Sequence, residues 1–184
     1  MSKNKTALIT GATSGIGKAT AHEFAKHGIK LVLWGRRQER LDTIKSALSK
    51  QTEVITLNFD VRDKTKVFNA IESLPESYKH IDILINNAGN AVAAITEGMR
   101  IDLNPYNIKV SSINPGLVET EFSQVRFKGD AVADTVYKGY KALQPKDIAD
   151  IIYFVITRPQ HVNIADLLVF PSAQANSVTV KKNL

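Results

Sequence analysis

The sequence predicts an α/β fold, a doubly wound parallel sheet in three layers with helices on both faces. Apolar runs of strand length alternate with amphipathic runs of helix length along the 184 residues. A glycine-rich turn, Gly11–Gly17, joins the first apolar run to the first amphipathic one. Asparagine-rich turns close two later apolar runs. The length fits a single domain, residues 1–184, with a sizeable core.

The first half of the chain contains four predicted strands. Gly28 is a typical residue just after a helix, and Pro75 cannot continue one. Leu41, Ile44 and Leu48 fall on one face of the second helix. We therefore expect strands at 6–10, 30–34, 54–58 and 82–86, with helices at 16–27, 38–49 and 64–73 between them.

The second half continues the alternation. Pro105 ends the next helix, and Asp147 carries a negative charge that suits the first turn of a later one. The tail 171–184 lacks periodicity, so it packs on a neighbouring subunit or stays mobile. We expect a helix at 91–103, a strand at 108–113, a polar loop at 119–130, helices at 131–143 and 145–156, and a strand at 165–170.

Composition narrows the class of protein. The absence of cysteine excludes disulfides and thiol ligands and fits a reducing compartment. The four histidines share no ligand spacing, so we expect no metal site. The N-terminus lacks the features of a signal peptide, and no apolar run is long enough to span a bilayer. We expect a cytoplasmic protein with no membrane partner.

The net charge of +6 has two interpretations. Nucleic acid is disfavoured because the lysines and arginines are scattered and the aromatic residues do not interleave with them. A basic surface that attracts an anionic cofactor is simpler. We expect no nucleic-acid partner.

The glycine-rich turn has the spacing Thr-Gly-x-x-x-Gly-x-Gly. Glycine permits positive φ and close approach of a ligand, and the following helix presents N–H groups to a phosphate. The alternative is a tight strand-to-helix loop without a ligand. Because the turn lies between an apolar run and an amphipathic one, we favour cofactor binding by Gly11, Thr13, Ser14, Gly15, Ile16 and Gly17.

Two arginines, Arg36 and Arg37, follow the second predicted strand. In dinucleotide-binding folds a carboxylate here binds the ribose hydroxyls of NAD. Guanidinium groups match a phosphate instead, and Ser14 adds a hydroxyl. We therefore predict a preference for NADP. The alternative is a solvated pair that opens the next helix, since Arg40 continues the charged run.

Polar residues follow the later strands, where open α/β sheets bind ligands. Asp60 accepts from an adenine amino group, or caps the third helix, or both. The pair Asn86–Asn87 shapes a ligand wall or only a turn, and Thr120 donates to the cofactor. The predicted cofactor residues here are Asp60, Val61, Asn87, Ala88, Gly89, Pro115, Gly116, Val118 and Thr120.

These motifs, in this order and across nearly the whole chain, resemble the short-chain dehydrogenase/reductase family. The runs 35–41, 81–84, 115–122 and 125–130 look like those of the NADP-dependent 3-hydroxy acid dehydrogenases, which act on serine and allo-threonine. The resemblance implies a Rossmann-type fold, NADP, hydride transfer with a small-molecule substrate, and a homo-oligomer, tetramer or dimer. Arg126 can pair with a substrate carboxylate; the alternative is a solvated loop arginine.

The family's catalytic serine and Tyr-x-x-x-Lys pair are missing. In the family they lie between the Asn-Asn-Ala-Gly turn and the helix that resembles 91–103, and here those two motifs almost touch. The catalytic residues therefore stay unknown. Tyr137 and Lys141 have the right spacing, but they follow Pro115-Gly116 and no family serine precedes them, so we reject them.

Two explanations remain for the missing block at residues 89–91. Either the natural protein carries an additional segment there, or the block is deleted and the chain is a non-enzymatic NADP-binding or scaffolding protein. A deletion would remove a central strand and a covering helix and expose apolar sheet faces. We therefore favour the additional segment.

Overall fold

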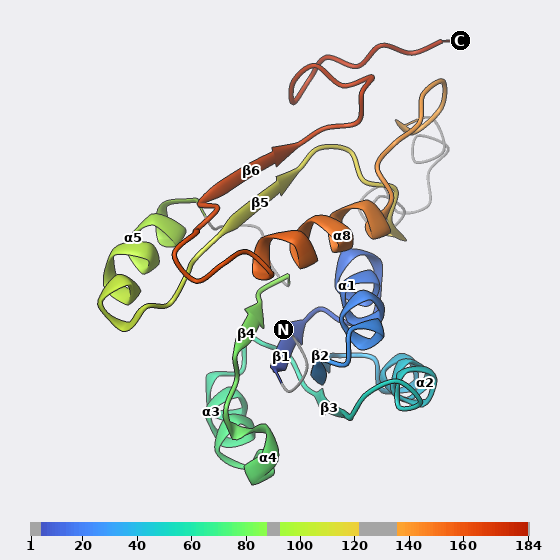
Figure 1. The fold of residues 1–184 in the computed structure, drawn as a ribbon. Helices are drawn as coiled ribbons and strands as arrows, with labels where there is room; N and C mark the ends of the chain where they lie inside the picture. The colour runs from blue at the N-terminus through green and yellow to red at the C-terminus, as the bar shows by residue number, and fades with distance from the viewer. Residues whose placement is uncertain (1–4, 88–92, 122–135, 184) are drawn as a thin grey trace. The chain divides into compact units, whose positions relative to one another are not determined.

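The computed structural model describes residues 5–87, 93–121 and 136–183. The chain forms two compact units, residues 1–89 and 90–184 (Figure 1). The missing block predicted at 89–91 lies outside the described residues. The single domain over 1–184 stays a prediction.

The first unit is built on a four-stranded parallel sheet in the order β3-β2-β1-β4. This order is one half of the doubly wound arrangement, and the predicted α/β class is confirmed. Its elements are β1 (Thr6–Thr10), α1 (Gly15–Lys26), β2 (Lys30–Gly35), α2 (Gln38–Leu48), β3 (Val54–Asn58), α3 (Lys64–Glu72), α4 (Glu76–Lys79) and β4 (Ile83–Ile85).

Helices cover both faces of this sheet (Figure 1). Leu8 and Trp34 belong to a core cluster that includes Leu74, just after α3, and Tyr78 of α4. The residues that alternate with them along the strands point to the opposite face. There α1 and α2 pack, and Phe24 of α1 is fully buried. The result is the three-layer arrangement that the alternation of strands and helices predicts.

The predicted boundaries in this unit hold within two residues. Gly28 has φ 69° just after α1, the left-handed conformation expected of a helix-ending glycine. The short helix α4 was not predicted. The strand β4 begins one residue later than predicted, because the Asp82 carboxylate accepts a hydrogen bond of 2.8 Å from the Thr6 backbone N–H.

The outer edge of β4 is open in the described part of the chain, where β4 pairs with β1 alone. Strands of parallel sheets are normally covered on both faces. Leu84, in the middle of β4, is instead 59% exposed. The edge strand of this sheet, β4, is therefore as apolar as a strand in the middle of a sheet.

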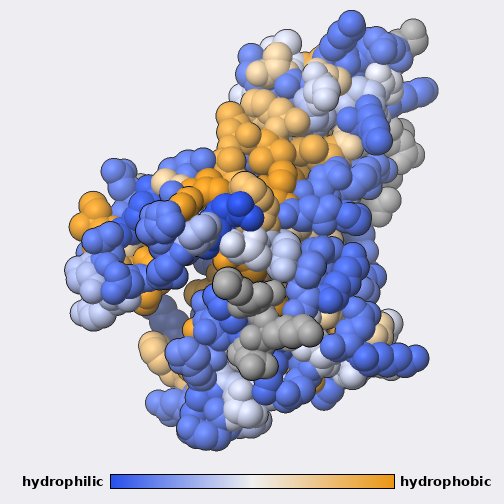
Figure 2. Space-filling view, in the orientation of Figure 1, coloured by the Kyte–Doolittle hydropathy of each residue, from blue (hydrophilic) through white to orange (hydrophobic). Residues whose placement is uncertain are grey.

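The second unit holds a separate two-stranded parallel sheet, β5 with β6. Hydrophobic residues gather at the surface over this sheet (Figure 2), and Leu168 of β6 is 67% exposed. Its elements are α5 (Ala93–Leu103), a 3-10 turn (Asn104–Tyr106), β5 (Ser112–Pro115), α8 (Pro145–Ile156) and β6 (Asp166–Val169).

The strand predicted at 108–113 lies instead at 112–115. Its four residues pair with the four residues of β6, so the partner strand sets its limits. The residues just before β5 form no strand and are held by a turn and by side-chain hydrogen bonds. Asn107 has φ 57°, and the Lys109 ammonium donates to the backbone carbonyls of Arg158, Pro159 and Val162 at 3.1–3.2 Å.

One further prediction for this unit is wrong, and the packing of the tail on a neighbouring subunit stays a prediction. The helix expected at 131–143 does not extend over 137–143, where turns follow and Gly139 has φ 85°. Residues 131–135 lie outside the described part. The tail after Pro171 folds back on itself: Gln174 and Val180 form an antiparallel bridge, and the Lys181 N–H donates to the Ala173 carbonyl.

No helix in the described part of the chain combines the length and apolarity needed to cross a membrane.

Leu41 and Lys45 of α2 lie four residues apart, one fully buried and the other exposed. We expect Leu41→Ala to lower the free energy of unfolding by about 2–5 kcal/mol, because it leaves a cavity in the core. Lys45→Ala should change it by less than about 0.5 kcal/mol. Urea unfolding followed by the fluorescence of Trp34, the single tryptophan, measures both. Equal effects would contradict the packing of α2 against the sheet.

Candidate active site

The glycine-rich turn connects the end of β1 to the start of α1. Gly11 and Gly15 have φ of 65° and 52°, which residues with a Cβ rarely adopt. Gly17 is needed for a different reason. A Cβ on Gly17 would lie 2.5 Å from the Gly11 carbonyl oxygen and 2.7 Å from Nδ2 of Asn87. The spacing of the three glycines therefore follows from backbone conformation at two positions and close packing at the third.

The first turn of α1 is suited to an anion. Ser14 is the N-cap, in an extended conformation, and its side chain makes no capping hydrogen bond. The first N–H groups of a helix have no partner within the helix and carry the positive end of its dipole. The first turn contains no acidic residue. A phosphate group would find hydrogen-bond donors and a favourable field here.

Asn87 joins the end of β4 to this turn. Its Nδ2 donates to the carbonyl oxygens of Thr10 and Gly11, at 3.3 and 3.4 Å. Its backbone N–H donates to the Thr10 hydroxyl at 3.0 Å. The side chain predicted to contact a cofactor therefore holds the shape of the glycine turn in this structure. The neighbouring residues Ala88 and Gly89 lie outside the described part of the chain.

Arg37 extends from the end of β2 to the same turn. Its Nη2 donates to the hydroxyls of Thr13 at 3.0 Å and Ser14 at 2.8 Å. Gly35 permits this close approach of the two strand ends, because a Cβ there would lie 2.5 Å from Cγ2 of Thr13. The structure thus brings together three of the predicted site positions: Thr13, Ser14 and Arg37.

Asp60 follows β3, next to the end of β2. Arg62 makes three hydrogen bonds to its carboxylate: the backbone N–H and Nε donate to Oδ1 at 3.0 Å each, and Nη2 donates to Oδ2 at 2.7 Å. These bonds hold the pKa of Asp60 far below its usual value, and the charge of Arg36 lowers it further. Asp60 is therefore an anion at any neutral or mildly acidic pH.

The capping role considered for Asp60 is wrong. The N-cap of α3 is Asp63, whose carboxylate accepts from the Lys66 N–H at 3.1 Å. The side chain of Asp60 is instead bonded to Arg62, next to the ends of β2 and β3. Val61 beside it is 37% exposed.

The remaining predicted residues belong to the second unit, after β5. Gly116 packs closely, because a Cβ there would lie 2.5 Å from Phe170 and 2.3 Å from the Gln174 side-chain oxygen. Val118 forms a parallel bridge with Leu143 and is buried. These contacts hold the backbone between Pro115 and Thr120 in place. Arg126 lies outside the described residues.

Tyr137 has a structural partner that supports its rejection as a catalytic residue. Its hydroxyl donates to the Val118 carbonyl at 2.8 Å, so it holds the segment after β5. Lys141 is exposed. The spacing of this pair therefore reflects no shared site in the second unit.

One residue of the first unit was missed by sequence reasoning. Arg62 lies two positions after Asp60, and nothing in a scattered basic surface singles it out. The only available signal was its place between two aspartates in the run Asp60–Asp63.

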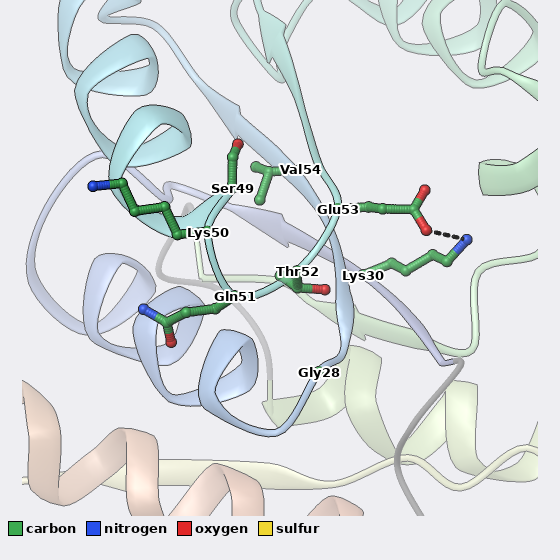
Figure 3. Close-up of a pocket in the computed structure, with 8 residues that line it drawn as sticks. All are labelled: Gly28, Lys30, Ser49, Lys50, Gln51, Thr52, Glu53 and Val54. Atoms are coloured by element: carbon green, nitrogen blue, oxygen red, sulfur yellow. Dashed lines mark ion pairs between the residues drawn. The ribbon is translucent and has the colours of Figure 1, made fainter.

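A shallow hollow of about 450 Å³ lies elsewhere in the first unit (Figure 3). Its lining residues include those where β2 and β3 begin, and Lys30 forms an ion pair of 2.8 Å with Glu53 across it. Ligands of open parallel sheets bind at the opposite, carboxyl edge. The candidate site is therefore the glycine turn and not this hollow. Among the described residues, no cluster of acidic residues and histidines could hold a metal ion.

The sequence is similar to those of known dehydrogenases and reductases. A family profile described as short chain dehydrogenase matches residues 5–94. An NADP-dependent 3-hydroxy acid dehydrogenase of Schizosaccharomyces pombe is 35% identical, over 94% of this chain and 95% of the relative. Sulfoacetaldehyde reductase 2 of Chromohalobacter salexigens is 32% identical, over 91% of this chain and 94% of the relative.

Among solved structures, the closed form of a serine dehydrogenase complexed with NADP+ is 28% identical. Its TM-score is 0.86, and the match covers 97% of this chain and 100% of that one.

The alignments are longer than the chain. They run over 245 and 238 positions, whereas this sequence has 184 residues. The two relatives therefore contain residues that have no counterpart here.

Gly17 and Gly98 provide a matched pair of substitutions. Gly17→Ala should lower the free energy of unfolding by about 1–3 kcal/mol, since the new methyl group overlaps the Gly11 carbonyl. Gly98 lies in α5 with nothing within 4 Å of an added Cβ. Gly98→Ala should raise stability by about 0.5–1 kcal/mol, the helix propensity of alanine over glycine. Chemical unfolding measures both, and a Gly17→Ala protein as stable as the parent would contradict the close approach.

Proposed function

This chain belongs to the short-chain dehydrogenase/reductase family, a family of oxidoreductases, and on that premise we propose that it binds NADP and interconverts a hydroxyl and a carbonyl group on a small 3-hydroxy acid. Serine and allo-threonine are the first substrates to test. The observation that carries the cofactor preference is the end of β2, where Arg36 and Arg37 occupy the place of a carboxylate and Arg37 is bonded to the glycine turn.

The residues of the first unit fit such a cofactor. The first turn of α1 contains no acidic residue and presents N–H groups that have no partner within the helix, so it suits the diphosphate. The guanidinium groups of Arg36 and Arg37 suit the 2′-phosphate, with the Ser14 hydroxyl beside them. Asp60 and Val61 would hold the adenine, one by accepting from its amino group and the other by apolar contact.

The residues at later strand ends would hold the rest of the cofactor. Asn87, Ala88 and Gly89 would follow the ribose, and the run Pro115–Thr120 would face the amide end. When bound, the nicotinamide supplies or accepts the hydride. This chain's own residues orient that ring and exclude water from one side of it.

Proton transfer would come from the missing block. The resemblance implies a serine that orients the substrate oxygen, a tyrosine that acts as general acid and base, and a lysine that lowers the pKa of the tyrosine. Exposed Leu84 at the open edge of β4 supports an additional segment near residues 89–91. The long alignments agree with it, since the relatives contain residues that have no counterpart here, but they do not place those residues.

The substrate class follows from chemistry shared among the relatives. One is named for 3-hydroxy acids and another for sulfoacetaldehyde. In each of these substrates the anionic group is attached to the carbon next to the reacting one. Arg126 is our candidate for pairing with that anion, and a carboxylate is the anion we favour. We also propose a cytoplasmic homo-oligomer, tetramer or dimer.

The alternative function is an NADP-binding or scaffolding protein without catalysis. Such a protein would have the same cofactor site as the proposed enzyme and would lack the block that contains the catalytic residues. This alternative predicts that the protein isolated from its natural source binds NADP and oxidises nothing.

Arg36→Ala tests the cofactor preference, with Arg40→Ala as its control. We expect Arg36→Ala to weaken binding of NADP about 10- to 100-fold, the loss of charge-assisted hydrogen bonds to a phosphate. Binding of NAD should change less than about twofold because NAD lacks that phosphate. Calorimetric titration of both cofactors measures the effects. If Arg40→Ala lowers NADP affinity equally, the arginines act only as a general basic surface.

Intact mass and turnover separate the enzyme from the alternative. For the protein isolated from its natural source, we expect a mass well above 20.3 kDa. We also expect NADP+ reduction with serine. A natural protein of 20.3 kDa that binds NADP and reduces none would favour the non-enzymatic function.

A further inference from the structure

Asp60 lies where a negative charge should hinder NADP. Asn58 of β3 pairs with Gly35 of β2, so the two residues that follow each strand come close together. The Asp60 Oδ2 is accordingly 3.7 Å from Nη1 of Arg36. A carboxylate at this edge repels a 2′-phosphate and competes with it for the same guanidinium.

Arg62 changes that balance. It engages both oxygens of Asp60 through Nε and Nη2 and adds its backbone N–H to Oδ1. Both side-chain contacts are 3.0 Å or shorter, the bidentate geometry that arginine makes with a carboxylate. The contact from Arg36, at 3.7 Å, is longer than a hydrogen bond. Asp60 is therefore bonded to Arg62, and Arg36 lies near it without a hydrogen bond between them.

We infer that Arg62 is a positioning residue for cofactor specificity: it neutralises and holds Asp60, and so leaves Arg36 to the 2′-phosphate of NADP. The inference rests on the proposed NADP site. Arg62 acts through Asp60 and touches no part of the cofactor in this account. Without it, Asp60 would draw Arg36 closer than the 3.7 Å ion pair that the two already form and would present more of its charge to the phosphate.

The test is the ratio of NADP to NAD affinity, measured by calorimetric titration of the 184-residue chain. Arg62→Ala should lower this ratio about fivefold, the effect of one exposed charge pair, and high salt should shrink the difference. Arg62→Lys should restore part of the ratio, since lysine keeps the charge without the two-pronged geometry. Lys66→Ala removes one positive charge from a side chain that contacts Asp63 at 3.3 Å, and it should leave the ratio unchanged.

A double variant separates action through Asp60 from direct attraction of the phosphate. In Asp60→Asn/Arg62→Ala the charge that Arg62 restrains is absent, so the ratio should return to that of the parent. A double variant as impaired as Arg62→Ala would overturn the inference, because Arg62 would then act on the phosphate directly. Asp60→Asn also alters the adenine contact, but that contact is common to both cofactors and cancels in the ratio.

The outcomes distinguish this inference from the proposed function. If the parent prefers NADP and Arg62→Ala keeps that preference, only the role of Arg62 is overturned. If the parent binds NAD as tightly as NADP, the proposed cofactor site fails and the inference fails with it.

Discussion

The close approach of Asn87 and Gly11 to Gly17 is the contact on which the first unit's site depends. No side chain fits between the first turn of α1 and the end of β1, and the Asn87 amide occupies that space. By donating to the carbonyls of Thr10 and Gly11, the amide ties three strand and helix ends into one conformation. The N–H groups of the helix are thereby aimed at a fixed point. A phosphate site made from backbone needs this rigidity because it has no flexible side chains to adjust.

Charge gives the site its second constraint. The pyrophosphate part of a dinucleotide needs only backbone donors, whereas the choice between NAD and NADP depends on one additional phosphate. Arg37 connects the two parts, because it extends from β2 and donates to the hydroxyls of the glycine turn. In the proposed site Asp60 would oppose that phosphate, and Arg62, which is bonded to both oxygens of Asp60, would compensate its charge. Specificity at such an edge therefore reflects the sum of neighbouring charges rather than a single residue.

Local patterns allowed much of the first unit to be predicted. The strands 6–10 and 54–58 are apolar runs ended by turns, and they lie where the sequence places them. Gly11 and Gly15 adopt the positive φ that their spacing suggests. Arg62 was missed because its ion pair with Asp60 is exposed, and exposed ion pairs produce no regular pattern in the sequence. For the Asn87 amide the sequence left a ligand wall and a turn role open, because its bonds to the glycine turn depend on how β1 and β4 pair.

The second unit was harder to predict because distant partners set its boundaries. The strand β5 is limited by the length of β6, 50 or more residues later, and not by the apolar run before it. The helix expected at 131–143 does not form over 137–143, where Gly139 has a positive φ and Leu143 forms a bridge with Val118. The catalytic groups form a separate case. A sequence cannot identify residues that it does not contain. In the described part of the chain, β4 pairs with β1 alone.

The most direct measurement is a crystal structure of the protein grown with NADP. We predict the diphosphate at the first turn of α1 and the 2′-phosphate within hydrogen-bond distance of Arg36 and Arg37. Asp60 should keep its two-pronged contact with Arg62. A cofactor bound away from the glycine turn, or a 2′-phosphate directed to solvent with both arginines elsewhere, would contradict the account.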